Sequence, residues 1–304
     1  MIQYTYLGRV AYGEGLRLQE ELVELRYRDC IGNTLLLLEH PPVLTLGRNA
    51  NRSNVLAGDD LLARRGVTLH QINRGGDVTY HGPGQLVGYP IFDLRSLRGP
   101  GGGRLGPVDF VRRIEEALIR LCGEFGVRAG RIAGLTGVWC GLAARHREAE
   151  PPAGVSEGTA SAVPNRPQLE LGTLAPAGRQ AERKIGAIGI HVSRGITSHG
   201  FAFNVTTDLR DFALINPCGI TDRPVTSLER EVPDPATLPA LEDIACRSAI
   251  EFGRVFDQPV ASLESIETLR AQAAAAGFPA EDTPLTIPRD VERLAGTADR
   301  PTRA

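Results

Sequence analysis

A short apolar run bounded by prolines restricts the fold of this chain more than any other segment. Thr34 to Glu39 contains four consecutive leucines and ends at His40-Pro41-Pro42. The run is too short for a typical helix, and its composition is typical of a strand buried within a sheet. The residue before a proline also favours extended backbone. Val43 to Leu46 follows as a second extended segment, so the sequence predicts a sheet with a buried strand.

Other stretches have helical spacing, so the predicted fold class is mixed α/β. Their apolar residues are Leu18, Leu22 and Leu25; Val111, Ile114, Leu118, Leu121 and Phe125; and Leu241, Ile244, Phe252 and Val255. Spacing of this kind is typical of helices packed on a core. Pro107 and Asp109 lie where the second helix is expected to begin, a position that favours proline and acidic residues. Cys122 and Cys246 fall within these helices, and we interpret them as packing residues.

Composition and charge exclude several classes of function. The 304 residues have a net charge of −2, with 42% apolar and 23% charged residues. These values are typical of a soluble globular protein and argue against a nucleic-acid or membrane surface. No stretch approaches about 18 consecutive apolar residues, and the first residues do not have the pattern of a signal peptide. The five cysteines are widely spaced without a Cys-x-x-Cys pair, which predicts neither disulfides nor a zinc site and favours a reducing cytoplasm.

Two segments lack regular patterning. Residues from about 145 to 180 are rich in Pro, Gly, Ser and charge, and such a composition buries too little surface to offset the entropy of ordering. We therefore expect a flexible surface insertion. The tail beyond about residue 265 predicts one helix followed by a frayed end. The expected organisation is a main domain over residues 1–260 and a partly disordered C-terminal extension over residues 261–304.

The first candidate site segment is a glycine-rich loop from Asn73 to Gln85. Four glycines allow its backbone to approach a ligand closely and to present N–H groups. The loop matches neither the Walker pattern nor Gly-x-Gly-x-x-Gly. A purely structural turn is an alternative explanation, but Thr79-Tyr80-His81 among the glycines favours a binding loop.

The second candidate segment is a strand from Arg183 to Val192. Small and apolar residues with recurring Ile and Val predict the strand. Gly186 and Gly189 mark positions where another backbone or a ligand comes close. His199 to Val205 is predicted to form the adjacent strand.

Lys184 is the only lysine of the chain, although lysine and arginine together number 34. An arginine guanidinium cannot lose its proton at ordinary pH, whereas a lysine ammonium can. A solitary lysine therefore suggests a position where a proton must leave or a compact charge must fit. An accident of an arginine-rich composition is the alternative.

Cys218 lies between Pro217 and Gly219, which predicts a turn, a position where a thiol can be exposed. A free thiol has a pKa of about 8.5, and a nearby ammonium such as that of Lys184 lowers it. Once the thiolate is acylated, the lysine is free to accept or relay a proton from an incoming amine. A cysteine and a lysine together suit acyl transfer from a thioester to an amine through an acyl-enzyme.

With these residues the chain resembles the lipoyl(octanoyl) transferase family over roughly residues 1 to 260. The segments that carry the resemblance, in the order of the family, are Glu39 to Gly47, Arg74 to Gln85, Gly137-Val138-Trp139, Lys184 to Val192, His199 to Val205, and Asn216-Pro217-Cys218-Gly219-Ile220. The chain departs from the family in the 145–180 insertion, where a short hairpin is usual, and in the tail.

The resemblance implies a mixed, largely antiparallel sheet flanked by helices, the catalytic fold of biotin and lipoate protein ligases. It implies transfer of octanoate from octanoyl-acyl carrier protein to a lysine of lipoyl domains, in 2-oxoacid dehydrogenase complexes and the glycine cleavage H protein, without a cofactor. Cys218 would hold the acyl thioester and Lys184 would activate it. The residues implied to bind the acyl group are Arg74, Gly75, Gly76, Asp77, Val78, Thr79, Tyr80, His81, Ala187, Ile188, Gly189, Gly200, Phe201 and Ala202. His81 and His199 receive no proton-transfer role.

Two alternatives remain at this point. An ATP-dependent lipoate or biotin ligase would share the fold and use Lys184 at a phosphate, but it has no need of a nucleophilic thiol. A non-catalytic scaffold that only binds lipoyl domains would have no need of either Cys218 or Lys184. A requirement for ATP identifies the first alternative, and an acyl-enzyme excludes the second.

Overall fold

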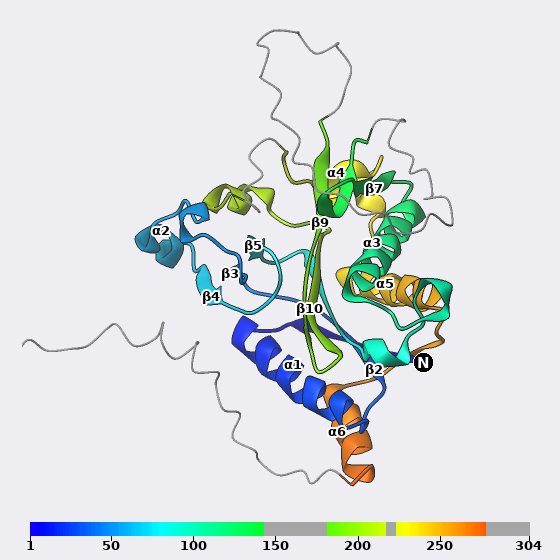
Figure 1. Ribbon diagram of the computed structural model, residues 1–304. Helices are drawn as coiled ribbons and strands as arrows, with labels where there is room; N and C mark the ends of the chain where they lie inside the picture. Colours follow the sequence, from blue (N-terminus) through cyan, green and yellow to red (C-terminus); the bar gives the residue numbers. More distant parts are fainter. Residues whose placement is uncertain (143–180, 217–222, 278–304) are drawn as a thin grey trace, which may run out of the picture.

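The structure, a computed structural model, describes residues 1–142, 181–216 and 223–277 (Figure 1). Within these ranges eight strands form one sheet in the order β11-β1-β2-β6-β10-β9-β8-β7. The strands are β1 (Ile2–Arg9), β2 (Asn33–Glu39), β6 (Gln85–Ile91), β7 (Ala129–Ile132), β8 (Leu135–Cys140), β9 (Arg183–Ser193), β10 (Ile196–Asn204) and β11 (Val260–Ser262). β11, β1 and β2 are parallel, and every later neighbour in this order is antiparallel. The expected mixed, largely antiparallel sheet is confirmed.

Helices cover both faces of this sheet (Figure 1). The longer helices are α1 (Tyr12–Tyr27), α3 (Pro107–Glu124), α5 (Leu241–Phe256) and α6 (Ile266–Ala275). α3 and α5 bury their apolar stripes against one face, where Phe110, Leu118 and Phe252 join a single core. α1 and α6 pack on the opposite face with Leu22 and Leu269. The three helices predicted from apolar spacing are therefore confirmed, because each presents that spacing to the sheet.

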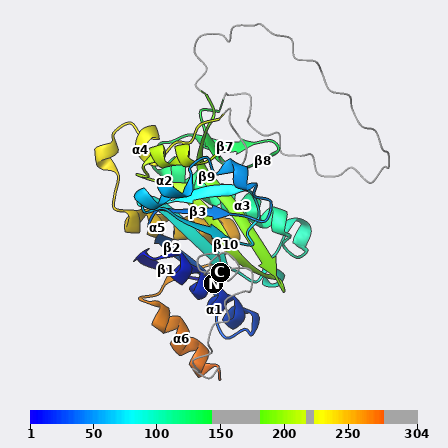
Figure 2. The ribbon, with the colours of Figure 1, turned by 90° about the vertical axis from the view of Figure 1, so that its left-hand side faces the viewer.

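A second, smaller sheet lies beside the large one. Its strands, in the order β4-β3-β5, are β3 (Val43–Leu46), β4 (Thr68–Gln71) and β5 (Val78–His81). They share a core with the short helix α2 (Asp59–Arg64) and the 3₁₀ helix Leu209–Leu214. Figure 2 shows this small sheet in front of the strands of the large one. The segment predicted as a glycine-rich loop, Asn73 to Gln85, contains β5 of the small sheet and ends at the first residue of β6 in the large sheet, so it connects the two sheets.

The two strands that flank the insertion are neighbours in the sheet, as expected for strands that a short hairpin usually joins. β8 and β9, which flank residues 143–180, pair with each other at Cys140↔Arg183 and Trp139↔Lys184. The insertion itself lies outside the described residues. The chain continues after β10 through α4 (Leu228–Glu231) to α5.

The beginning of the expected C-terminal extension belongs to the sheet. β11 pairs with β1 through Ile2↔Val260, so the boundary expected at residue 260 falls inside a strand. The predicted helix beyond residue 265 is α6, and Leu269 is buried on the α1 face of the sheet. Residues 261–277 are thus part of the main domain, because their apolar side chains complete its core. Across the described ranges, every helix is too short or too polar to cross a lipid bilayer.

Candidate active site

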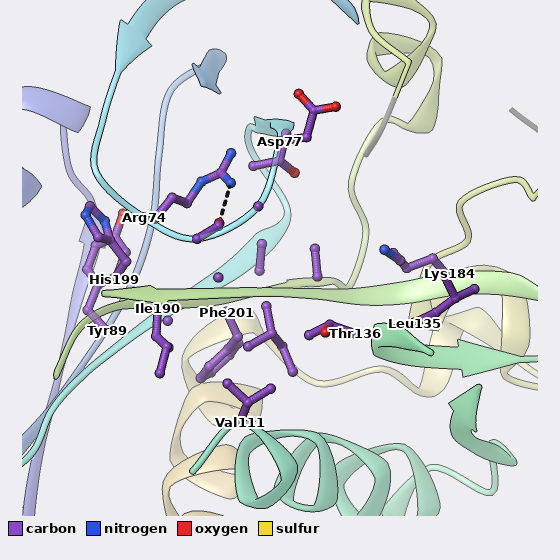
Figure 3. A pocket seen from close by; sticks show the side chains of 18 of the residues that line it. Arg74, Asp77, Tyr89, Val111, Leu135, Thr136, Lys184, Ile190, His199 and Phe201 are labelled. Carbon is purple, nitrogen blue, oxygen red and sulfur yellow. Dashed lines mark hydrogen bonds between the residues drawn. The ribbon is translucent and has the colours of Figure 1, made fainter. Parts of the chain in front are cut away.

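A cavity of about 520 Å³ opens where β8 ends its pairing with β9. β8 accompanies β9 only from Arg183 to Gly186, and the rest of β9 continues to Ser193. The glycine-rich loop crosses this edge, since Gly75 N donates to Ile190 O at 3.0 Å. Figure 3 shows the cavity on both sides of the strands, with Arg74 and Asp77 on one side and Val111 and Phe201 on the other.

The structure brings together all but one of the predicted acyl-binding residues. The predicted residues that line the cavity are Arg74, Gly75, Gly76, Asp77, Val78, Thr79, His81, Ala187, Ile188, Gly189, Gly200, Phe201 and Ala202. They come from three segments that are distant in sequence. The close packing at Gly189 agrees with the expectation from its sequence, because a Cβ there would lie 2.6 Å from Gly75 O.

Tyr80 is the exception, because it does not line the cavity. Its side chain is buried in the core of the small sheet with Phe212, and its hydroxyl donates to Asp211 Oδ2 at 2.8 Å. Tyr80 alternates with Thr79 and His81 along β5, so its side chain points to the face opposite theirs, toward the core of the small sheet. Tyr80 therefore stabilises the small sheet on the side away from the cavity.

Arg74 fastens the loop to the small sheet. Its buried guanidinium donates from Nη2 to Thr45 O at 2.7 Å and from Nη1 to Gly75 O at 3.0 Å. Asp77, at the other end of the loop, accepts from Asn51 N at 3.2 Å and from the Asn54 side chain. Hydrogen bonds thus hold the loop at both ends.

Lys184 lies at the opposite end of the cavity from Tyr89 and His199 (Figure 3). Only 9% of the residue is exposed. Its Nζ lies 4.7 Å from the centre of the Trp139 ring, a geometry in which the ring face attracts the ammonium. Lys184 is thus one of the residues that line the cavity.

Cys218 lies outside the described residues, but both flanks of residues 217–222 are described. Before them, Asn216 N donates to Asn54 O at 2.7 Å, beside Asp77. After them, Lys184 N donates to Pro224 O at 2.9 Å, and Thr226 N donates to Lys184 O at 2.9 Å. The chain thus enters this segment next to the glycine-rich loop and leaves it next to Lys184.

A hydrogen-bond relay fixes the tautomer of His81. Asn204 Nδ2 donates to Thr226 O at 2.9 Å, so Asn204 Oδ1 accepts from Gln85 Nε2 at 2.9 Å. Gln85 Oε1 must then accept from His81 Nδ1, at 2.8 Å. Burial lowers the pKa of His81 to about 3, so the ring is neutral at physiological pH. Its Nε2 consequently has a lone pair to offer and no proton to give.

At the other end of the cavity, neutral polar side chains lie close to the charge of Arg74. His199 has a left-handed backbone, with φ 54°, and its Nε2 lies 2.7 Å from Asn73 Oδ1. Burial, together with the charge of Arg74, lowers the pKa of His199 to about 3. Tyr89 donates its hydroxyl to His40 Nε2 at 2.7 Å, because His40 Nδ1–H is directed at Val10 O. Both histidines that received no proton-transfer role are thus neutral.

Sequence reasoning did not assign the wall formed by α3 and the β7–β8 turn. The residues on this wall are Pro107, Val108, Val111, Arg112, Gly134, Leu135 and Thr136. Val111 was identified only as part of a helical stripe. Val108 is 72% exposed, an unusual position for an apolar side chain at a helix start. Only the docking of α3 on β9 brings this wall to the cavity.

Two of the remaining cysteines are unsuited to nucleophilic chemistry. Cys122 is fully buried in the core, and burial raises the pKa of its thiol far above the usual value. Burial, and then the charge of Glu231, raises the pKa of Cys140 to about 12. Neither thiol ionises near neutral pH. Among the described residues, no group of His, Cys, Asp and Glu is arranged to hold a metal ion.

The fold places the chain in a structural class that includes the lipoate protein ligases. A putative lipoate protein ligase from T. acidophilum with bound lipoic acid aligns with a TM-score of 0.55, over 90% of this chain and 93% of that one, at 13% identity. Lipoate-protein ligase A bound with ATP aligns with a TM-score of 0.52, over 90% and 94%, also at 13% identity. At such identities the likeness concerns the fold alone.

The chain belongs to the lipoyl protein ligase A/B catalytic domain family, which matches residues 11–249. An octanoyltransferase of Acidobacterium capsulatum is 56% identical over 87% of this chain and 94% of its own length. An octanoyltransferase of Koribacter versatilis is 45% identical over 97% of both chains. The resemblance inferred from the sequence motifs is confirmed.

Proposed function

We propose that the chain transfers an octanoyl group from octanoyl-acyl carrier protein to a lysine of a lipoyl domain, through an acyl-thioester on Cys218 that Lys184 activates. The class of reaction follows from octanoyltransferases that are 56% and 45% identical over most of the chain, so the protein is an acyltransferase of the lipoylation family. We further propose the identity of the donor and of the acceptors, the covalent intermediate, and a cytoplasmic location.

One observation carries the proposal for the site. The only lysine of the chain is buried at one end of the cavity, beside the segment by which the chain leaves residues 217–222. Cys218 is two residues from Asn216, whose N–H donates to Asn54 O, and the Asn54 side chain donates to Asp77 of the glycine-rich loop. An ammonium at this position favours a thiolate over a thiol.

The proposed chemistry has two balanced steps. The Cys218 thiolate attacks the carbonyl carbon of the donor thioester and a new carbon–sulfur bond forms. The bond to the carrier sulfur breaks, and the carrier thiolate takes the proton of the Lys184 ammonium, which leaves Lys184 neutral. The neutral amine of the acceptor lysine then attacks the acyl-enzyme, an amide forms, and the Cys218 thiolate is released. The proton lost by the amine passes to Lys184 or through it to water.

The cavity suits an acyl chain in this scheme. The small side chains Ala187, Gly189 and Ala202 line it from the strands, while Val111 and Phe201 offer apolar surface on the other side (Figure 3). Backbone groups of the glycine-rich loop lie opposite. A chain of methylene groups gains from apolar contact of this kind without requiring charge.

Intact-mass spectrometry with octanoyl-acyl carrier protein tests the proposal. One octanoyl mass is expected on the wild type, removable with neutral hydroxylamine, and none on Cys218→Ala. Cys246→Ala, a change at a half-buried helical thiol, is the matched control and should be acylated like the wild type. Transfer to a lipoyl domain should proceed without ATP. Transfer by Cys218→Ala at the wild-type rate would refute the covalent mechanism, and an ATP requirement would identify a ligase.

Lys184→Arg tests the role of the lysine. The charge remains, so iodoacetamide should still alkylate Cys218, but the proton can no longer leave. Turnover should fall by about 10²–10⁴-fold, the usual range for lost general acid–base assistance. Wild-type turnover in Lys184→Arg would assign the proton transfer to another group.

A further inference from the structure

Glu115 is a carboxylate in the interior of the protein. It lies on α3 within the stripe that packs on the sheet, and the residue is 0% exposed. A buried carboxylate is costly unless donors surround it. Glu115 Oε2 accepts from Arg112 Nη1 at 2.7 Å and from Arg131 Nε at 3.1 Å. Its Oε1 accepts from the backbone N–H of Gly137 at 3.0 Å.

Gly137 lies against the end of the Lys184 side chain. A Cβ on Gly137 would lie 3.4 Å from Lys184 Cε and 3.7 Å from Lys184 Nζ, and 2.6 Å from Gly186 O. The residue has φ 125°, a conformation that favours glycine. Trp139, two residues further along β8, presents its ring to the same ammonium at 4.7 Å. Lys184 therefore contacts one short segment of β8 at two points.

The sheet does not hold that segment at Gly137. Within the described strands, β8 pairs with β9 from Val138 onward and with β7 at Leu135, Trp139 and Cys140. Gly137 N has the Glu115 carboxylate as its acceptor instead of a strand carbonyl. The carboxylate thus accepts the hydrogen bond that a strand carbonyl would otherwise accept. It does so at Gly137, where the Lys184 side chain lies so close that a larger residue would crowd it.

We infer that Glu115 is a positioning residue for Lys184. Its hydrogen bond to the N–H of Gly137 holds the segment of β8 that contacts the Lys184 side chain, and this segment keeps the ammonium at the end of the cavity. The inference rests on the proposed role of Lys184 at Cys218. The two arginines occupy Oε2 and so direct Oε1 at Gly137. The same carboxylate joins the α3 wall of the cavity, through Arg112, to the strand that contacts the lysine.

Glu115→Gln is the test, because it keeps the shape of the side chain and removes its charge. A glutamine has one acceptor oxygen, so either the arginines or Gly137 N–H loses its partner. We expect kcat to fall by about 10–100-fold, as for a small misplacement of a catalytic group, with KM for the octanoyl donor within about twofold. The pH midpoint of Cys218 alkylation by iodoacetamide should rise toward that of Lys184→Ala.

Glu116→Gln is the matched control. Glu116 is the next residue of the helix and shares Arg131, whose Nη2 donates to Glu116 Oε2 at 3.0 Å, but it makes no contact with Gly137. Its kcat and alkylation midpoint should equal those of the wild type. If Glu115→Gln does not fold, Arg131→Gln removes one donor from Oε2 and should shift both quantities in the same direction by less.

The double variant Lys184→Ala/Glu115→Gln separates this inference from the proposed function. If Glu115 acts through Lys184, adding Glu115→Gln to Lys184→Ala leaves the alkylation midpoint unchanged. A folded Glu115→Gln with the midpoint and kcat of the wild type overturns the inference, as does a shift that persists in the Lys184→Ala background. If Lys184→Ala alone leaves the midpoint where it was, the proposed role of the lysine fails instead.

Discussion

The close approach of the glycine-rich loop to β9 leads to a sharp prediction for Gly189→Ala. A Cβ at residue 189 would lie 2.6 Å from Gly75 O, whereas ordinary contact begins at 3.4 Å. Loop and strand must therefore separate by about 0.8 Å to restore normal van der Waals contact. Strain from one extra methyl group in a packed region typically costs about 1–3 kcal/mol.

The loop cannot yield at one residue alone. It is tied by backbone hydrogen bonds from Gly47 N to Asp77 O at 3.2 Å, from Arg48 N to Arg74 O at 3.0 Å, from Asn49 N to Gly76 O at 3.3 Å, and from Gly75 N to Ile190 O at 3.0 Å. A shift at Gly75 therefore strains several bonds that define the cavity. We expect Gly189→Ala to lose about 1–3 kcal/mol of unfolding free energy and to raise KM for the octanoyl donor.

Urea unfolding and steady-state transfer kinetics measure both effects. Gly123→Ala is the control, because this residue lies within α3 and a Cβ there would meet nothing within 4 Å. The control should gain about 0.5–1 kcal/mol, as a helical glycine does on replacement by alanine, without a change in KM. A Gly189→Ala protein with wild-type stability and wild-type KM would show that the close approach does not shape the site.

Three further outcomes are expected. The free energy of unfolding should be flat above about pH 6.5 and should fall below it by about 1.4 kcal/mol per pH unit for each of His81 and His199. The reason is that these histidines have pKa values of about 3 in the folded protein and about 6.5 in the unfolded chain, so between these values only the unfolded chain binds the protons. Equal stability at pH 7.5 and 5.5 would contradict this. Native Cys122 and Cys140 should resist iodoacetamide at pH 8 and react only in urea, since burial keeps both thiols protonated. Deletion of residues 147–178 should preserve folding and acylation, because β8 and β9 pair directly on either side of the insertion; an insoluble product would show that the insertion packs on the core.

Most of the cavity was predicted through the family resemblance of its motifs, and local signals predicted the close backbone approaches within it. Glycines within the loop and within β9 predict a close approach of two backbones, and the contact between Gly189 and Gly75 is such an approach. The apolar run at Thr34 became a central strand for the same kind of reason, since only a strand buries so short a run on both faces. Lys184 stood out by its rarity and does reach the cavity.

Tertiary packing decided what local patterns cannot express. Tyr80 was expected at the cavity with its neighbours, but the register of β5 turns it to the opposite face, where Asp211 accepts its hydroxyl hydrogen bond. Leu269 was expected in a peripheral tail, and it completes the core between α6 and the sheet. Both positions depend on which element lies alongside, which a single segment does not specify.

The sequence by itself thus determined the mixed α/β class and the unusual lysine, because apolar periodicity and residue chemistry are properties of short stretches. The family resemblance of its motifs indicated which segments meet at the site. Only the tertiary structure decided which face each side chain presents, and that Glu115 is buried to hold Gly137 beside Lys184. In sequence, Glu115 is one more acidic residue on an amphipathic helix. Its carboxylate accepts from the backbone N–H of Gly137, which lies 22 residues further along the chain. The residues next to Glu115 in the sequence therefore do not predict this contact.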